Sequence, residues 1–223
     1  NGDLNLDYSE ISSSNLASKN FLNSLQFDLL VNDSQIVSTD VGQLFSSFET
    51  NYKETWIVKL EISGYLNDLE IRKWFLSNKK NNIELNCKIT NILDKDYSLI
   101  FDILEFNVDS KEINKAFPNF FGSILPSSLR SFGRFNIDGL ISVNPDDVKS
   151  KFNFQTKQGL LISDLNIFDF KNIDNASYIG EIKGVDLGLS SFLNVNYITK
   201  SDFNFKVEGK GFTKEYLNSS LTG

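Results

Sequence analysis

The stretch "RFNIDGLISVNPDDVKSKFNF", Arg134–Phe154, consists of two alternating segments joined by an "NPDD" turn. Apolar residues and one glycine occupy every second position of the first segment, Phe135, Ile137, Gly139, Ile141 and Val143, and Phe152 and Phe154 alternate in the second. The intervening positions of the first segment are polar and include Arg134, Asn136, Asp138 and Ser142. Because successive side chains of a strand point to opposite faces, this stretch predicts two antiparallel strands, apolar on one face and polar on the other.

The same two-residue period recurs along the rest of the chain. The whole sequence has only three prolines but 20 phenylalanines. Its apolar phases are Leu4, Leu6, Tyr8; Leu25, Phe27, Leu29, Val31; Trp56, Val58, Leu60, Ile62; Ile83, Leu85, Cys87, Ile89; Leu99, Phe101, Ile103; and Phe203, Phe205, Val207. After Ile103 the phase slips to Leu104, Phe106 and Val108, which predicts a β-bulge or a bend. These segments favour a mostly β fold, a meander of antiparallel strands.

One segment, Ser110 to Gly133, has apolar residues at helical spacing and is interrupted by Pro118 and Pro126. It predicts one or two short amphipathic helices lying over an end of the sheet. Ser110 is the expected cap of the first helix, and Ser127 or Ser128 the expected start of a second helical turn. No linker-like run interrupts the chain, so residues 1–223 are interpreted as a single continuous segment.

Composition excludes several classes of protein. The net charge of -7 disfavours nucleic acid as a partner, and the absence of histidine together with the single cysteine, Cys87, excludes His-based triads, Cys/His zinc sites and intrachain disulfides. The acidic pairs Asp94/Asp96 and Asp146/Asp147 are typical of turns, and Cys87 is expected to be a small core residue. No stretch is long and apolar enough to span a bilayer. We therefore expect neither an enzyme nor a cofactor.

Several longer phrases follow one another in a familiar order. The most informative are "ILPSSLRSFGRFNIDGLI" (Ile124–Ile141), the F-x-x-x-x-G-L-L-x-x-D-L-x-I phrase of Phe154–Ile167, and the Y-x-G-x-I phrase that begins at Tyr178. Together they resemble the TamB family of the translocation and assembly module, within the AsmA-like group, most closely its Bacteroidota version. The resemblance covers Val37 to Gly223, and the first 36 residues share with the family only the general alternating pattern.

The resemblance implies an elongated, curved antiparallel sheet that forms an open groove, or β-taco, with an apolar lining. It implies an internal segment of a periplasmic protein of a Gram-negative bacterium. Such a protein is anchored in the inner membrane by an N-terminal helix and works with an outer-membrane protein of the Omp85 type through a C-terminal region. Its expected ligand is phospholipid, carried between the two membranes, and its expected further role is to support outer-membrane protein assembly.

On this interpretation the lining of the groove comes from the apolar phases. The candidate lining residues are Leu85, Cys87, Ile89, Phe101, Ile103, Phe135, Ile137, Ile141, Val143, Phe152, Phe154, Phe203, Phe205 and Val207. Gly209 and Gly211 continue the inward phase of the last of these segments, where they would let the sheet curl or leave room for a neighbouring backbone or an acyl chain.

Two other interpretations remain open. The apolar phases of a closed β-sandwich or barrel would look the same, because they would simply form its core. An open sheet could also bind client strands at its edges during outer-membrane protein assembly, without carrying lipid.

Overall fold

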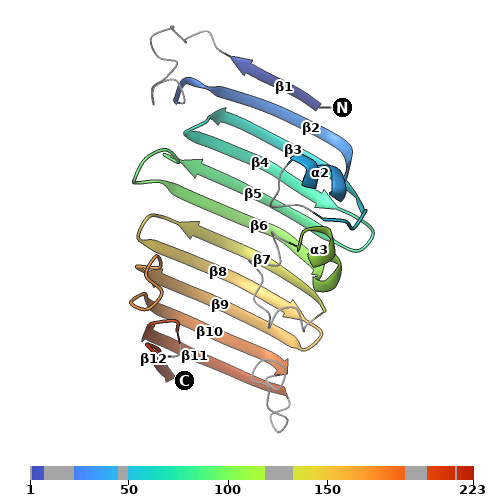
Figure 1. The fold of residues 1–223 in the computed structure, drawn as a ribbon. Coiled ribbons are helices and arrows are strands. Elements are labelled where there is room, and N and C mark those ends of the chain that lie inside the picture. Colours follow the sequence, from blue (N-terminus) through green and yellow to red (C-terminus); the bar gives the residue numbers. More distant parts are fainter. Residues whose placement is uncertain (1, 8–22, 45–49, 119–132, 189–199, 214) are drawn as a thin grey trace.

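A computed structural model of the chain describes residues 2–7, 23–44, 50–118, 133–188, 200–213 and 215–223. Twelve strands form one sheet, and each strand pairs with its neighbours in the sequence from β1 to β12 (Figure 1). The strands are β1 (Gly2–Asp7), β2 (Gln26–Val37), β3 (Thr55–Tyr65), β4 (Asp68–Ser77), β5 (Asn82–Thr90), β6 (Ser98–Asp109), β7 (Arg134–Val143), β8 (Asp147–Thr156), β9 (Gly159–Phe168), β10 (Ser177–Gly188), β11 (Lys200–Lys210) and β12 (Asn218–Thr222).

All neighbouring strands are antiparallel, and short connections explain why. Only residues 66–67 join β3 to β4, and only residues 157–158 join β8 to β9. A parallel crossover needs a dozen or more residues, so each of these turns forces the next strand to lie antiparallel beside the previous one. The predicted fold class, a mostly β antiparallel meander in one open sheet, is confirmed.

The predicted slip in β6 is a bulge. The register shifts between Ile103 and Phe106 against β7, and Phe106 then pairs with Ile137 on the apolar side. Leu104, which the phase slip had placed with the apolar residues, is 49% exposed. The bulge therefore absorbs one residue and returns Phe106 and Val108 to the face that Phe101 occupies.

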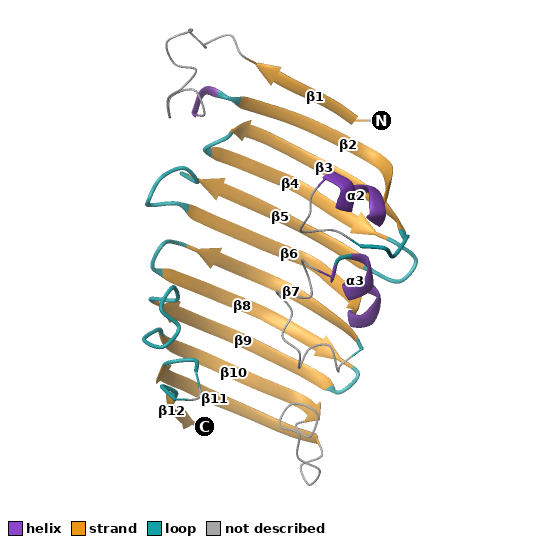
Figure 2. Cartoon of the chain, in the orientation of Figure 1, coloured by secondary structure: helices purple, strands orange, loops and turns teal. Residues whose placement is uncertain are grey.

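Two short helices lie on the side of the sheet that faces the viewer, near one end of the strands (Figure 2). α2 (Ser38–Leu44) follows β2, and α3 (Ser110–Ala116) follows β6. α3 confirms a helix at the start of the predicted segment, but its N-cap is Asp109 and not Ser110. The Asp109 carboxylate accepts hydrogen bonds from the backbone N–H groups of Lys111 and Glu112, whereas Ser110 is buried in the first turn. The predicted second helix, at Ser127 or Ser128, lies outside the described residues.

The core sits where α3 meets the sheet. Ile113, Ala116 and Phe117 are buried against Trp56 and Phe135. The cluster also contains Ile83, Val108 and Phe154. The ring centroids of Trp56 and Phe117 are 5.4 Å apart, and those of Phe135 and Phe154 are 5.5 Å apart. The helix thus buries one end of the apolar side of β3 and β5–β8.

Candidate functional site

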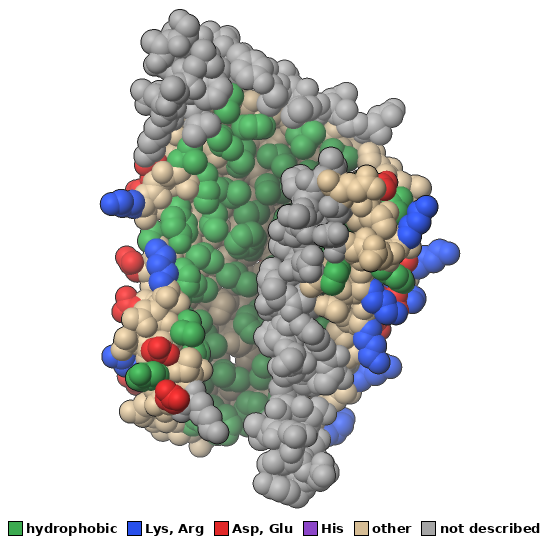
Figure 3. All heavy atoms as spheres, viewed as in Figure 1, with side chains coloured by type: hydrophobic (Ala, Val, Ile, Leu, Met, Phe, Trp, Pro, Cys, Tyr) green, Lys and Arg blue, Asp and Glu red, His purple; other side chains and the backbone are tan. Residues whose placement is uncertain are grey.

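One face of the sheet is apolar from β2 to β11, and it is called the apolar face here. Residues that pair directly across strands point to the same side of a sheet, so the register identifies the members of this face. The central row reads Leu29, Ile62, Ile71, Cys87, Phe101, Ile141, Ser150, Leu165, Gly180 and Val207. Figure 3 shows hydrophobic side chains gathered in a hollow over these strands.

The register brings all the predicted lining residues together on this face. Cys87, Phe101, Ile141 and Val207 lie in the central row. The rows on either side contain Ile89 and Val143; Leu85, Ile103, Phe152 and Phe205; Ile137, Phe154 and Phe203; and, nearest to α3, Phe135. All the candidate residues therefore lie on one face of the sheet, and their role as the lining of a lipid groove stays a prediction.

The sequence interpretation missed much of the same face. β4 contributes Leu69, Ile71, Trp74 and Leu76, β9 contributes Leu161 and Leu165, and β10 contributes Tyr178 and Ile182. Trp74 is 38% exposed although it lies on the apolar face, whereas Trp56 beneath α3 is fully buried. The two tryptophans show that the apolar face is covered at the α3 end and accessible at Trp74.

The glycines of the apolar face are sites where a neighbour approaches closely. A Cβ on Gly184 would lie 2.3 Å from Cε1 of Phe203, and one on Gly209 would lie 2.4 Å from Oη of Tyr178. The side chains of neighbouring strands therefore lie over these glycines. Gly211 differs, because it follows the end of β11 and has φ +76, with the backbone oxygen of Tyr216 2.3 Å from an added Cβ.

These contacts decide what Gly209 and Gly211 do locally. Gly211 leaves room for the neighbouring backbone at Tyr216. At Gly209 the Tyr178 ring takes most of the space that a side chain would need. That ring is held by a 2.6 Å hydrogen bond between Tyr178 Oη and Ser219 Oγ and by packing against Phe212, with centroids 4.9 Å apart. The space at these two positions is thus already filled by the protein.

Two serines interrupt the apolar face on β8 and β9. Ser150 Oγ donates a 3.4 Å hydrogen bond to the Leu165 carbonyl. Ser163 is 2% exposed, and its hydroxyl has no hydrogen-bond partner among the described residues. Both side chains are small and uncharged, so they interrupt the apolar lining without placing a charge in it.

A network of polar side chains holds α3 in place over the sheet. Tyr52 Oη donates a 2.9 Å hydrogen bond to Glu112, and the ammonium groups of Lys80 and Lys115 lie 3.3 and 3.4 Å from the same carboxylate. The hydrogen bond from Tyr52 and the two lysines lower the pKa of Glu112, and the carboxylate raises the pKa of the Tyr52 hydroxyl. The network links the segment before β3, the β4–β5 turn and α3.

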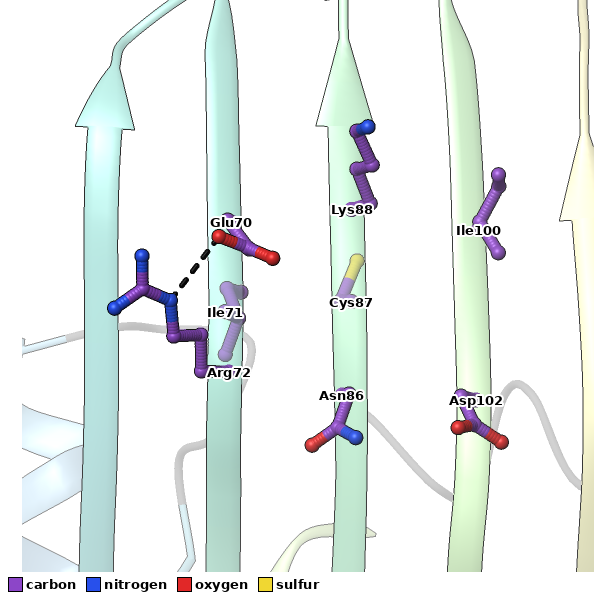
Figure 4. A pocket seen from close by; sticks show the side chains of 8 residues that line it. All are labelled: Glu70, Ile71, Arg72, Asn86, Cys87, Lys88, Ile100 and Asp102. Carbon is purple, nitrogen blue, oxygen red and sulfur yellow. Dashed lines mark hydrogen bonds and ion pairs between the residues drawn. The ribbon is translucent and has the colours of Figure 1, made fainter.

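The opposite face, called the polar face here, mixes charged and polar side chains with exposed apolar ones such as Ile100 and Leu140, and it carries a small hollow of about 250 Å³ (Figure 4). Glu70, Lys88 and Ile100 pair across β4, β5 and β6 there. Arg72 Nε donates a 3.1 Å hydrogen bond to Glu70, and both side chains are more than half exposed. An exposed ion pair of this kind contributes little to the stability of the fold.

Chemistry is limited at the remaining candidate residues. Asp146 lies in the β7–β8 turn and Asp147 begins β8, where its carboxylate accepts a 3.0 Å hydrogen bond from Asn144 Nδ2. Cys87 is 4% exposed, and burial raises the pKa of its thiol. No group of three or more His, Cys, Asp or Glu side chains within the described ranges could hold a metal ion. In the same ranges, no helix is long and apolar enough to cross a membrane.

Comparisons of the chain with models of known protein families, with curated proteins and with solved structures find no match. The apolar face itself is therefore the basis for any functional assignment.

Proposed function

We propose that this chain is a segment of a conduit that carries phospholipid between the inner and outer membranes, with the acyl chains lying along the apolar face. The observation that carries this proposal is the continuity of that face. Apolar residues and glycines align across ten neighbouring strands, β2 to β11, interrupted by Ser150 in the central row and few other polar residues.

The organisation of the strands also supports the proposal. In a closed sandwich a second sheet would cover this face, but all the described strands belong to one sheet, so the closed-sandwich alternative is wrong for them. Among the described residues, α3 and its neighbours bury the margin near Phe135, and Cys87 and Val207 are buried further along the face, whereas Trp74 remains 38% exposed. The accessible remainder offers hydrocarbon a lining that stabilises it by about 0.8 kcal/mol for each buried methylene, without any specific contact.

The chemistry of the described residues fits transport better than catalysis. Moving a lipid along a surface breaks no covalent bond, so it needs neither a nucleophile nor an activated acid. Support for outer-membrane protein assembly, also expected from the TamB resemblance, would use the same segment as a bridge between the two membranes.

A second candidate function uses the edge of the sheet. β12 pairs with β11 on one side, and all five of its residues are exposed. An edge of this kind can bind an extended client strand through backbone hydrogen bonds. Such binding would not involve the apolar face, so the two functions make different predictions for variants of that face.

The decisive experiment compares two neighbouring residues of β7 that point in opposite directions. Ile141 lies on the apolar face, and Leu140 is 47% exposed on the polar face. The chain is incubated with phospholipid vesicles, repurified without detergent and analysed by native mass spectrometry. We expect bound phospholipid in the wild-type chain and in Leu140→Glu, and no bound phospholipid in Ile141→Glu. A charge in the lining would have to be desolvated when an acyl chain covers it, which opposes binding.

A photo-crosslinking amino acid gives an independent measurement. Placed at Phe205 it should label phospholipid, and placed at the adjacent Lys206, which is exposed on the polar face, it should not. Circular dichroism of each variant shows whether the sheet is intact. A folded wild-type chain that retains no phospholipid, or equal labelling from the two positions, would exclude the conduit.

A further inference from the structure

The two long rims of the sheet differ in charge. Because the strands form a meander, alternate connections lie on the same side of it (Figure 1). One rim, called the helix rim here, carries α2, α3 and the turns 78–81 and 157–158. The other, called the turn rim, carries the turns 66–67, 91–97, 144–146, 169–176 and 211–217.

The helix rim is basic. The turn 78–81 holds Lys79 and Lys80 with no acid, and the turn 157–158 holds Lys157 with no acid. α3 contributes Lys111 and Lys115 against Glu112 and its N-cap Asp109. The connection that contains α2 adds Asp40 and Glu54 against Lys53, so bases outnumber acids on the described part of this rim without being alone there. The basic side chains on the right of Figure 3 follow this rim.

The turn rim is acidic. Three of its turns each carry one more acid than base. These are Asp94 and Asp96 against Lys95, Asp146 without a base, and Asp169 and Asp174 against Lys171. The asymmetry is therefore a property of the two rims and not of the chain as a whole, whose net charge is -7.

The positive charge of the helix rim is only partly neutralised. Glu112 pairs with Lys80 and Lys115, whereas Lys79, Lys111 and Lys157 form no ion pair within the described residues. Arg134 donates hydrogen bonds to Asn107 Oδ1, at 3.0 Å, and to the backbone carbonyl of Lys80. Both of its acceptors are neutral, so the guanidinium keeps its full charge at the rim.

Arg134 and Lys157 also line a hollow of about 260 Å³ at the end of β6–β8. Thr156 and three side-chain amides also line it, and the amides of Asn107, Asn136 and Gln155 pair across β6–β8 on the face opposite the apolar face.

We infer that the helix rim binds the anionic head groups of the lipids whose acyl chains lie on the apolar face. The inference rests on the proposed function and adds an orientation and a selectivity to it. A lipid lying across the sheet places its phosphate beside Lys79, Lys111 or Lys157 and away from the aspartates of the turn rim. Charge complementarity thereby makes the conduit prefer anionic phospholipid to zwitterionic phospholipid.

The test uses vesicles of phosphatidylcholine that contain phosphatidylglycerol, and measures the ratio of the two lipids bound to the repurified chain. The rim variant is Lys79→Gln/Lys111→Gln/Lys157→Gln. The control variant is Lys95→Gln/Lys183→Gln/Lys206→Gln, which makes the same change in net charge at exposed lysines away from the helix rim. We expect the wild-type chain and the control to enrich phosphatidylglycerol over its share in the vesicles. In the rim variant the enrichment should fall at least about fivefold, since each lysine near an anionic surface strengthens binding by about that factor.

Salt provides a measurement that needs no variant. High ionic strength should remove the enrichment in the wild-type chain while leaving the total bound lipid unchanged, because salt screens exposed charges and does not weaken apolar contacts. Lipid bound by all three chains in the proportion of the vesicles would overturn the inference and leave the conduit standing. A folded wild-type chain that takes up neither lipid would overturn both proposals.

Discussion

The glycines of the apolar face allow a direct test of how tightly the sheet is packed. Gly139→Ala and Gly184→Ala add the same methyl group to the same face, on β7 and β10. At Gly139 the added Cβ would lie 2.2 Å from the backbone oxygen of Lys151 and 2.6 Å from Cα of Phe152. At Gly184 its three nearest neighbours would be atoms of the Phe203 ring, the nearest at 2.3 Å.

The two substitutions should therefore differ in cost. Gly139 has φ +144, where alanine is strained by about 1–3 kcal/mol, and its backbone contacts can be relieved only by separating β7 from β8. Each cross-strand hydrogen bond that is lost adds about 1 kcal/mol, so we expect a total of about 3 kcal/mol. At Gly184 the Phe203 ring can turn aside for about 1 kcal/mol, which is offset by the reduced entropy of the unfolded chain. We expect a net change of about 0–1 kcal/mol.

Urea unfolding followed by far-ultraviolet circular dichroism measures both free energies of unfolding. Phe203→Ala supplies the control, because without the ring Gly184→Ala should become neutral or slightly stabilising. Equal losses at Gly139 and Gly184 would refute the reasoning, and so would a cost at Gly184 that persists in the Phe203→Ala background.

Four further changes test other parts of the structure. Asp109→Ala should lower the free energy of unfolding, measured by thermal melting, by about 1 kcal/mol, because it removes the N-cap of α3. Asp109→Asn should keep most of that stability, because asparagine also caps helices well. Phe135→Ala should cost about 3–5 kcal/mol in urea unfolding, because the ring is 1% exposed at the core beneath α3; a cost below 1 kcal/mol would place the core elsewhere. Because the pKa of Glu112 is lowered in the folded state, its carboxylate stabilises the fold above the ordinary glutamate value of 4.5, and this stabilisation is lost as the pH falls through the folded-state pKa. In a plot of the free energy of unfolding against pH, Glu112→Gln should therefore show a shallower fall at acidic pH than the wild-type chain. Cys87 should react with a maleimide far more slowly in the folded chain than in urea, and a fast reaction under native conditions would contradict its burial and its raised pKa.

Alternation predicted strands where one face is bulky and the other polar, as in Arg134–Val143. It did not identify β4, β9 or β10 as alternating strands, for a physical reason in each. In β4 a register shift between Ile71 and Trp74 changes the phase within the strand. In β9 Leu160, Leu161 and Ile162 are consecutive apolar residues, so no period is visible.

β10 is obscured in the opposite way. Gly180 and Gly184 take inward positions, and Ile179, which is 47% exposed, points outward. Single-strand periodicity therefore reads the strand in the wrong phase. The large side chains that fill the inward space belong to the neighbouring strands, where Leu165 lies over Gly180 and Phe203 over Gly184. Such pairs depend on register, which the sequence of one strand does not contain.

The helix α2 was missed because its sequence favours a helix weakly. Ser38–Leu44 contains Thr39, Val41 and Gly42, all poor helix formers. The contacts of Ser38 hold its start, because this fully buried residue exchanges backbone and side-chain hydrogen bonds with the segment Tyr52–Glu54. Contacts across such a separation in the sequence override local propensity.

Alternation also cannot distinguish an open groove from a closed core, since both place apolar side chains on every second position. The connections decide the matter. Turns of a few residues hold β3–β6 and β7–β10 in sequence order, and the outer strands β1 and β12 each pair on one side only. An apolar surface of this extent is stable in water only when something covers it, and of the described residues α3 and its neighbours cover one margin. The phospholipid proposed above would supply this cover for the rest of the face, because an anionic phospholipid is apolar along its acyl chains and negatively charged at its head group.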